Sequence, residues 1–345
     1  MSLYEEIHSQ PEILQRSYER NLTAVQAIAQ DLRQRQIHYA FIAARGTSDN
    51  AARYANYLWG ATNHLPVALA TPSLFSLYDS PPRLDGALVI GVSQSGQSPD
   101  IVNVVAEGKR QGRPTLAITN APDSPLAQAA DYVIDIQAGA EKAVAATKTY
   151  TTQLLAMAML SAAWANDEPR LAQLAHLPDW VREVLRQDEH IARLAPRYRY
   201  MQQCVVLGRG YNYATAFEWS LKLKELTYVV AEPYSSADFR HGPIAVVADG
   251  FPVLAVAPGG AVYADMLALL QKLAQERRAE LLVISDQPEA LELATSPIPL
   301  PAGIPEWLTP LVSIVPGQLF SYWLTAVKGY NTEAPRGLNK VTKTT

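Results

Sequence analysis

The sequence predicts an α/β protein made of two copies of one parallel-sheet domain. Short apolar runs that end in Gly, Ser or Asn alternate with longer stretches of helical periodicity, which is typical of strand–helix units around a parallel sheet. The same succession occurs twice, from about residue 39 and from about residue 200. Gly91 aligns with Ala255 at an offset of 164 residues, and Ala117 aligns with Val283 at 166. Such constant spacing indicates an internal duplication.

In the first copy, a strand over 39–44 leads into RGTS at 45–48 and then a helix over 49–59. A strand over 87–92 leads into SQSGQS at 93–98 and a helix over 99–106. Two more strands follow at 114–119 and 132–136. The apolar runs predict buried strands, and the loops after them lie at the carboxyl edge of the sheet.

The second copy repeats the pattern, with strands at 204–207, 251–256 and 280–284 and a helix over 213–229. Arg209 and Gly210 stand where Arg45 and Gly46 stand in the first copy. The segment between the copies is charged and rich in Leu and Ala, which predicts a helical connector. The predicted parts are therefore an N-terminal helical segment 1–34, a first domain 35–166, a connector 167–197, a second domain 198–330 and a tail 331–345.

Composition excludes several classes of protein. The chain has 29 basic and 33 acidic residues and a net charge of −4, which argues against a nucleic-acid partner. Because Cys204 is the single cysteine, the chain has no internal disulfide framework. Cys204 lies in an apolar run and is expected to be a core residue. The N-terminus lacks the apolar core of a signal peptide, and no apolar stretch reaches about 18 residues. We therefore expect a cytoplasmic protein with no membrane partner.

The loop at 93–98 distinguishes the two copies, because the second copy has only APGG at 257–260. One interpretation is a simple turn, since serine and glycine are common in turns. The other is an anion cradle, in which hydroxyls, loop N–H groups and the start of the next helix hold a phosphate. Gly96 permits the backbone conformation that such a nest requires. No lysine is near, so the loop is neither a Walker loop nor a nucleotide fingerprint. The candidate ligands are Ser93, Gln94, Ser95 and Ser98, with Gly46, Thr47 and Ser48 from the neighbouring strand end.

The second copy carries a different candidate site. Glu218, Lys222 and Glu225 are spaced i, i+4 and i+7, which places them on one face of the predicted helix. They form either an exposed salt-bridge ladder or a group of proton-transfer side chains. Sixteen residues later, His241 precedes Gly-Pro on a predicted loop. A lone histidine is more often structural, but a loop is where proton-transfer groups are often placed.

Four motifs together resemble the tandem sugar isomerase (SIS) domain family: RGTS at 45–48, SQSGQS at 93–98, LKLKE at 221–225 and RHGP at 240–243. The family includes the isomerase part of glucosamine-6-phosphate synthase and stand-alone glucosamine-6-phosphate deaminases. The segments AATKTYTTQ at 145–153 and PRGLNK at 335–340 extend the resemblance over nearly the whole chain. It implies two SIS domains, each a parallel-sheet αβα sandwich of flavodoxin- or Rossmann-like form. Ser98 replaces the usual Thr and keeps the hydroxyl, whereas Gln97 replaces the usual Glu.

The resemblance also implies roles for individual residues. The phosphate of a hexose 6-phosphate or amino-sugar 6-phosphate would be held by Thr47, Ser48, Ser93, Gln94, Ser95 and Ser98. Glu225 would move a proton between C1 and C2, and His241, supplied by the neighbouring subunit, would assist ring opening. Lys340 would contact or form an imine with the open-chain carbonyl. Lys222 and Glu218 would surround the reactive end of the sugar. The backbone of Val144 and Ala145 would lie near the sugar. A homodimer with shared active sites is expected, without metal or organic cofactor.

Synthases of this family carry an N-terminal glutaminase domain, and the sequence starts at the SIS region. The resemblance therefore favours a deaminase that converts glucosamine 6-phosphate into fructose 6-phosphate and ammonia. The alternatives are a galactosamine-6-phosphate deaminase, a fructosamine-6-phosphate deglycase, an aldose–ketose isomerase and the isomerase subunit of a synthase. A phosphosugar-sensing regulator is the alternative outside the enzymes, although such regulators usually carry an N-terminal DNA-binding helical domain.

Overall fold

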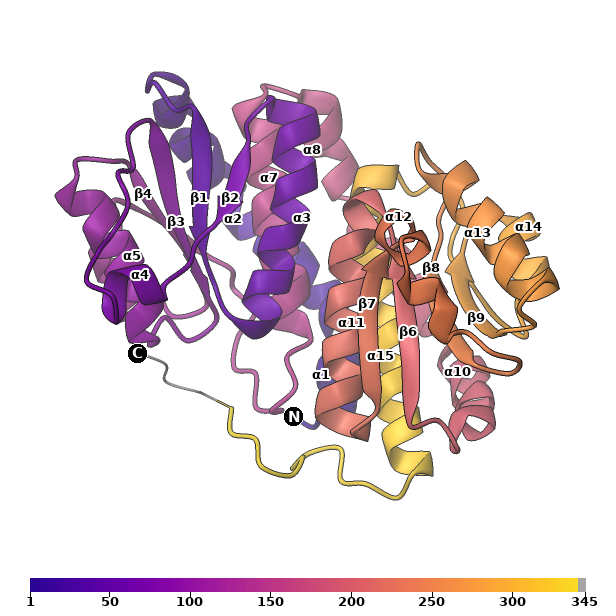
Figure 1. The fold of residues 1–345 in the computed structure, drawn as a ribbon. Coiled ribbons are helices and arrows are strands. Elements are labelled where there is room, and N and C mark those ends of the chain that lie inside the picture. Colours follow the sequence, from indigo (N-terminus) through magenta and orange to yellow (C-terminus); the bar gives the residue numbers. More distant parts are fainter. Residues whose placement is uncertain (341–345) are drawn as a thin grey trace. The chain divides into compact units, whose positions relative to one another are not determined.

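A computed structural model describes residues 1–340, so the part of the predicted tail 331–345 that follows Lys340 lies outside the described residues. The chain divides into two compact units (Figure 1). The first-sheet unit contains Ser9–Glu141, Ala146–His176 and the chain from Asn339. The second-sheet unit contains Met1–His8, Lys142–Ala145 and Leu177–Leu338. Each unit is built on one parallel sheet.

The first-sheet unit has five parallel strands in the order β2-β1-β3-β4-β5. Their bounds are β1 Tyr39–Ala43, β2 Val67–Leu69, β3 Ala87–Ser93, β4 Thr115–Thr119 and β5 Tyr132–Asp135. All seven residues of β3 are buried, because a central parallel strand is covered on both faces. Its near-continuous apolar run follows from that burial.

Helices cover both faces of this sheet, as Figure 1 shows. The helices of this unit are α2 Gln10–Arg33, α3 Gly46–Asn63, α4 Ser73–Ser76, α5 Pro99–Arg110, α6 Pro125–Ala129, α7 Lys148–Trp164 and α8 Glu168–Leu174. Helix α5 starts with Pro99 in its first turn, where a missing N–H is harmless, and buries Ile101, Val104 and Val105. Helix α7 is buried from Lys148 to Ala163, which explains why its apolar residues show no single face.

The second-sheet unit also has five parallel strands, in the order β7-β6-β8-β9-β10. Their bounds are β6 Gln203–Gly208, β7 Val230–Ser235, β8 Pro252–Val256, β9 Glu280–Ser285 and β10 Ser296–Pro299. The helices are α1 Leu3–His8, α9 Leu177–Leu185, α10 Asp188–Leu194, α11 Tyr213–Thr227, α12 Ser236–Arg240, α13 Tyr263–Gln275, α14 Pro288–Glu292 and α15 Thr309–Val327. Short 3-10 turns are η1 Ala195–Tyr198, η2 Gly210–Asn212, η3 Pro243–Val246 and η4 Glu306–Leu308.

Strand order and register confirm the predicted duplication. Each strand of the first sheet has a counterpart at the same place in the second, β1 with β6 and β3 with β8 among them. Gly91 lies opposite Ala117 in the first sheet, and Ala255 lies opposite Val283 in the second. These are the residues that the sequence alignment of the two copies paired. The fold is therefore one α/β domain used twice.

Two local expectations are settled by the structure. Cys204 in β6 is buried, as expected of a core residue, and this burial raises the pKa of its thiol. The predicted helix over 49–59 begins three residues earlier, because α3 starts at Gly46 and continues to Asn63. Within residues 1–340, no helix is both long and apolar enough to cross a bilayer.

Candidate functional site

The serine loop of the first-sheet unit joins β3 to α5. Ser93 is the last residue of the strand, and Ser98 is the N-cap of the helix. Gly96 has φ +61°, and a Cβ there would collide with the side chain of Ser124. Glycine is therefore required at this position both by the left-handed backbone and by the close neighbour. The loop has the sharp turn that an anion nest needs.

Hydrogen bonds inside this unit leave three serine hydroxyls with a proton to donate. The Ser93 Oγ accepts from the Gly96 N–H at 3.1 Å, and the Ser95 Oγ accepts from the Gln97 N–H at 3.4 Å. The Ser48 Oγ accepts from Nε2 of the buried Gln153 at 3.0 Å. A hydroxyl has one hydrogen and can accept as well as donate, so accepting leaves that hydrogen available for an anion. Sequence reasoning gave no role to Gln153, because nothing in the motif shows which side chain it contacts.

The start of α3 lies beside this loop through an ion pair. Arg45 is the N-cap of α3, and its Nε lies 2.8 Å from the carboxylate of Asp100 in the first turn of α5. Gly46 takes φ +51°, and Thr47 and Ser48 lie in the first turn of α3 rather than in a preceding loop. The pair therefore joins two helix N-termini, whose partial positive charges favour an anion.

Gln94 and Ser98 complete the predicted cradle. The carbonyl of Gln94 accepts from the Asn120 N–H at 3.2 Å, which attaches the loop to the end of β4. Ser98 makes no side-chain capping bond to α5, so its hydroxyl is not used to satisfy the helix. The structure thus places all the predicted anion ligands, Gly46, Thr47, Ser48, Ser93, Gln94, Ser95 and Ser98, at the ends of β1 and β3.

The equivalent loop of the second-sheet unit is occupied by the chain's own carboxylates. The Gly259 N–H donates to Asp286 Oδ1 at 2.7 Å, and the Ala261 N–H donates to Glu306 Oε2 at 3.0 Å. A Cβ at Gly260 would collide with the carboxyl group of Glu306. These N–H groups are already hydrogen-bonded to carboxylates. In the described chain, the N–H groups of Gly96 and Gln97 in the serine loop are bonded to serine hydroxyls instead. The geometry favours the serine loop as the anion site.

The charged stripe of α11 is buried. Lys222 Nζ lies 3.4 Å from Glu218 Oε1 and 2.5 Å from Glu225 Oε2. The side chains of Glu218 and Lys222 are 0% and 1% exposed, and that of Glu225 is 23% exposed. An exposed salt-bridge ladder is therefore excluded. Burying three charges on one helix is expensive unless they pair, so this arrangement is typical of a functional site. Glu225 is the member that solvent or a substrate can reach.

His241 follows α12 at the surface of the second-sheet unit. Its backbone N–H donates to the Asp238 carbonyl at 3.1 Å, and the preceding Arg240 is paired with Asp265. Gly242 takes φ +139°, which turns the chain away from the helix. The backbone is thus fixed while the side chain is exposed. Within residues 1–340, no hydrogen bond or ion pair joins its imidazole to the stripe on α11.

The loop that contains Val144 and Ala145 is held by a carboxylate that sequence reasoning missed. Glu6 in α1 is buried, and it accepts from the Lys142 N–H at 2.6 Å and from the Ala143 N–H at 3.3 Å. These contacts lie within the second-sheet unit. Lys340 lies in the first-sheet unit, where its Nζ is 2.6 Å from the carboxylate of Glu141. No sequence signal connected Glu6 or Glu141 with these segments.

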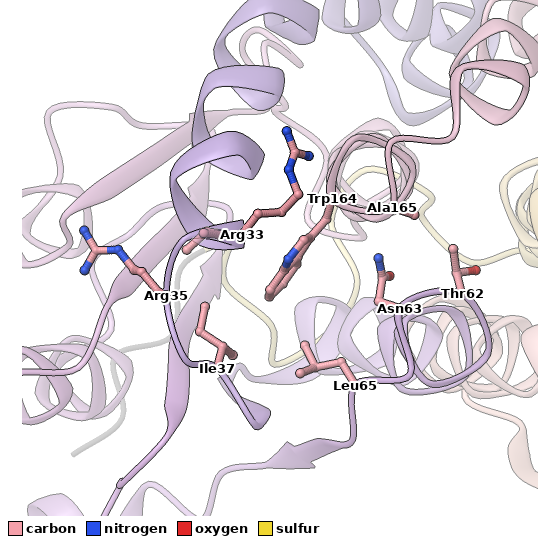
Figure 2. Close-up of a pocket in the computed structure, with 9 residues that line it drawn as sticks. Arg33, Arg35, Ile37, Thr62, Asn63, Leu65, Trp164 and Ala165 are labelled. Atoms are coloured by element: carbon pink, nitrogen blue, oxygen red, sulfur yellow. The ribbon is translucent and has the colours of Figure 1, made fainter.

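A pocket at the other edge of the first sheet contains none of the predicted site residues. It has a volume of about 360 Å³ and lies where Arg35 and Ile37 precede β1 (Figure 2). Arg33 Nη1 donates to the Ala163 carbonyl at 2.5 Å, and Asn63 Nδ2 donates to the Ser161 carbonyl at 3.0 Å. These polar groups therefore already make hydrogen bonds to the backbone of the protein. Among the described residues, no group of three or more His, Cys, Asp or Glu side chains is arranged to hold a metal ion.

Comparison with known proteins identifies the same family twice along the chain. The SIS domain family matches residues 34–163 and residues 200–328. A glutamine–fructose-6-phosphate aminotransferase (isomerizing) of Gloeobacter violaceus is 34% identical over 355 residues, covering 98% of this chain and 58% of its own. The corresponding enzyme of Pyrococcus horikoshii is 32% identical over 344 residues, covering 98% and 57%. The chain thus spans less than two thirds of the length of these relatives.

Solved structures agree with these matches. The C-terminal domain of glucosamine–fructose-6-phosphate aminotransferase from Francisella tularensis has a TM-score of 0.88 and 29% identity, covering 96% of this chain and 98% of its own. A Silicibacter pomeroyi protein described as a phosphosugar isomerase has a TM-score of 0.86 and 35% identity, covering 96% and 99%. A glucosamine-6-phosphate deaminase from Thermotoga maritima has a TM-score of 0.79 and 19% identity over the whole of both chains, a likeness of fold alone.

Proposed function

The chain belongs to the SIS domain family, and we propose that it is an enzyme that moves a proton between C1 and C2 of a hexose 6-phosphate. The observation that carries this proposal is the buried stripe on α11, in which Lys222 lies between Glu218 and the partly exposed Glu225. Glu225 contacts a buried ammonium and is partly exposed, so its carboxylate is placed to act as a general base on a bound substrate. The serine loop, with three hydroxyls left to donate, supports a phosphate as the substrate's anchor.

The finer proposal is that the substrate is an amino-sugar 6-phosphate, with glucosamine 6-phosphate first among them. In this reaction a proton is given to the ring oxygen and the ring opens, and His241 is the group proposed for that step. Glu225 then removes the proton on C2 and returns it to C1, which gives a fructose imine. Water adds to C2 and ammonia leaves, so the products are fructose 6-phosphate and ammonia. The chemistry needs one general base and one general acid.

An ammonia-release assay on the purified chain tests this proposal. Glucosamine 6-phosphate, galactosamine 6-phosphate and a fructosamine 6-phosphate are compared, and fructose 6-phosphate is measured in parallel. Ammonia and fructose 6-phosphate in equal amounts from glucosamine 6-phosphate are expected. Interconversion of an aldose and a ketose 6-phosphate without ammonia supports an isomerase, and absence of turnover on every sugar contradicts the enzyme proposal.

A second candidate is the isomerase part of an aminotransferase. It is favoured by the 34% identity to an enzyme named for that activity. In that case the chain works toward glucosamine 6-phosphate when ammonia or a glutamine-hydrolysing partner is supplied. Fructose 6-phosphate with ammonium chloride is the substrate pair that distinguishes this direction of flux.

Ser93→Ala and Ser95→Ala are each expected to raise KM about 10- to 100-fold with kcat nearly unchanged. A charge-assisted hydrogen bond contributes about 1.5–3 kcal/mol, and a phosphate held equally throughout the reaction affects KM alone. Ser80→Ala, on an exposed loop of the same unit, is the control and leaves KM unchanged. A KM unaffected by both substitutions contradicts the cradle.

His241→Asn is expected to slow turnover of cyclic glucosamine 6-phosphate much more than proton exchange on an open-chain analogue. The imidazole is proposed to serve ring opening alone, so a substrate that is already open does not need it. Mixing Glu225→Gln subunits with His241→Asn subunits is expected to restore part of the activity if a homodimer shares its active sites. Equal losses on both substrates contradict the ring-opening role.

A further inference from the structure

Glu141 is a fully buried carboxylate to which the mechanism above gives no role. Its side chain is 0% exposed, and it lies in the first-sheet unit just before the loop that leads into α7. Oε1 accepts from the Thr147 N–H at 3.0 Å and from the Thr149 N–H at 3.1 Å. Oε2 accepts from the Thr149 hydroxyl at 2.8 Å and from Lys340 Nζ at 2.6 Å. All four partners belong to the same unit.

The ammonium that reaches this carboxylate comes from the far end of the chain. Lys340 lies 199 residues after Glu141 and is the last described residue. Its side chain is 24% exposed, so the ion pair is largely withdrawn from solvent. Four residues earlier, the Arg336 guanidinium lies 3.9 Å from the centre of the Tyr228 ring, and the Arg336 N–H donates to the Tyr228 hydroxyl at 2.9 Å. That contact belongs to the second-sheet unit.

We propose that Glu141 is a positioning residue that docks the C-terminal tail by binding the ammonium of Lys340. The docking follows from the contacts of the first-sheet unit alone. Its consequence for turnover rests on the proposed function, in which Lys340 acts on the open-chain sugar.

Hydrogen bonds from the protein hold the Glu141 carboxylate in the orientation in which it binds Lys340. Two backbone N–H groups and one hydroxyl fix its orientation, and Thr147 and Thr149 supply them from a single short segment. None of these three bonds is made by the tail. Burial by itself raises the pKa of Glu141, but the Lys340 ammonium and these hydrogen bonds hold it below its usual value. An ionised, buried carboxylate favours a cation over any neutral group.

A second lysine, Lys148, lies close to the same segment. Lys148 lies at the start of α7 and is 2% exposed, and its Nζ donates to the Ala140 carbonyl at 2.6 Å. It therefore contacts the backbone just before Glu141, and Lys340 contacts the carboxylate itself. A tail without a cation at position 340 leaves the carboxylate with its backbone and hydroxyl donors only.

Reductive methylation of the full chain, followed by mass spectrometry of its peptides, tests the docking without any substrate. In Glu141→Gln, Lys340 is expected to react about tenfold faster or more than in the unmodified chain, because a charge-assisted bond worth about one decade is lost. Lys272, which is 47% exposed, is the internal reference and keeps its rate. The matched control is Glu168→Gln, an exposed carboxylate in the same unit, and it leaves Lys340 protected. An unchanged rate at Lys340 in Glu141→Gln overturns the proposal.

Lys340→Met removes the ammonium from the same contact and leaves the buried carboxylate in place. Hydrogen–deuterium exchange is expected to rise at residues 339–340, while the Thr147 and Thr149 amides stay protected by Glu141. Unchanged exchange at these two residues overturns the docking, also in the event that Glu141→Gln does not fold.

Steady-state kinetics then test whether the contact between Glu141 and Lys340 affects turnover. Glu141→Gln is expected to lower kcat at least about tenfold with KM changed less than twofold, because the phosphate ligands are elsewhere. A fast-reacting Lys340 with normal kcat supports docking and contradicts its role in turnover. If the unmodified chain turns over no phosphosugar, the proposed function fails, and the methylation result still decides the docking.

Discussion

Glu225→Gln is expected to lower kcat at least about 100-fold while KM changes little. The amide keeps the shape of the carboxylate and can still accept a hydrogen bond from Lys222, but it has no basicity. General-base catalysis contributes about 10²- to 10⁴-fold, which sets the size of the loss. Initial rates on glucosamine 6-phosphate or on the active phosphosugar measure it. Deuterium exchange at C2 is expected to fall in parallel.

Glu232→Gln is the control for this substitution. Glu232 lies on β7 of the same unit with its side chain exposed, and its loss of charge is expected to leave kcat unchanged. Near-normal turnover by Glu225→Gln would assign the stripe on α11 to structure rather than to catalysis. A comparable loss in Glu232→Gln would point to the net charge of the unit as the cause.

Lys222→Met is expected to lower the free energy of unfolding by about 3–5 kcal/mol. Removing one partner of a buried ion pair is strongly destabilising, and Glu218, with 0% exposure, then loses the Lys222 ammonium. Urea unfolding at pH 7, followed by circular dichroism, measures the shift of the midpoint. Lys224→Met, on the exposed side of the same helix, is the matched control and is expected to change stability by less than about 0.5 kcal/mol.

The double variant Glu218→Gln with Lys222→Met separates charge from packing. If the loss comes from the carboxylate that loses the Lys222 ammonium, the double variant recovers a large part of the stability lost in Lys222→Met. If both variants are equally unstable, the stem of Lys222 contributes through packing instead. A Lys222→Met chain as stable as the Lys224→Met control would contradict the ion-pair interpretation.

The buried central strands were the predictable part of this fold, whereas β2, β7 and β10 were not predicted from the sequence. Buried parallel strands read as short apolar runs, so β3 and β8 could be located and paired from sequence, and the duplication could be seen in Gly91 and Ala255. The start of α3 was misplaced by three residues, because Gly46 with positive φ and two hydroxyl residues resemble a loop. Helix boundaries depend on backbone angles that composition does not reveal.

The candidate site was predictable where its residues share one motif and unpredictable where distant segments meet. The hydroxyls of the serine loop and the i, i+4, i+7 spacing on α11 were visible in sequence. Gln153 beside Ser48 and Lys340 beside Glu141 were not, because these pairs are 105 and 199 residues apart. The burial of Lys222 was also invisible, since spacing gives a face of a helix and not what covers it.

One ion pair occurs in both halves and bears on how the two halves arose. Arg45 holds Asp100 in the first-sheet unit, and Arg209 holds Asp265 at the corresponding place in the second, with Nη1 2.6 Å from Oδ2. Only the first half keeps the hydroxyl loop, whereas the second half fills the same position with Glu306. A pair that persists where the ligand groups are gone cannot owe its persistence to the ligand. It belongs to the framework that the two halves share, whereas the loops that follow the strands differ between them.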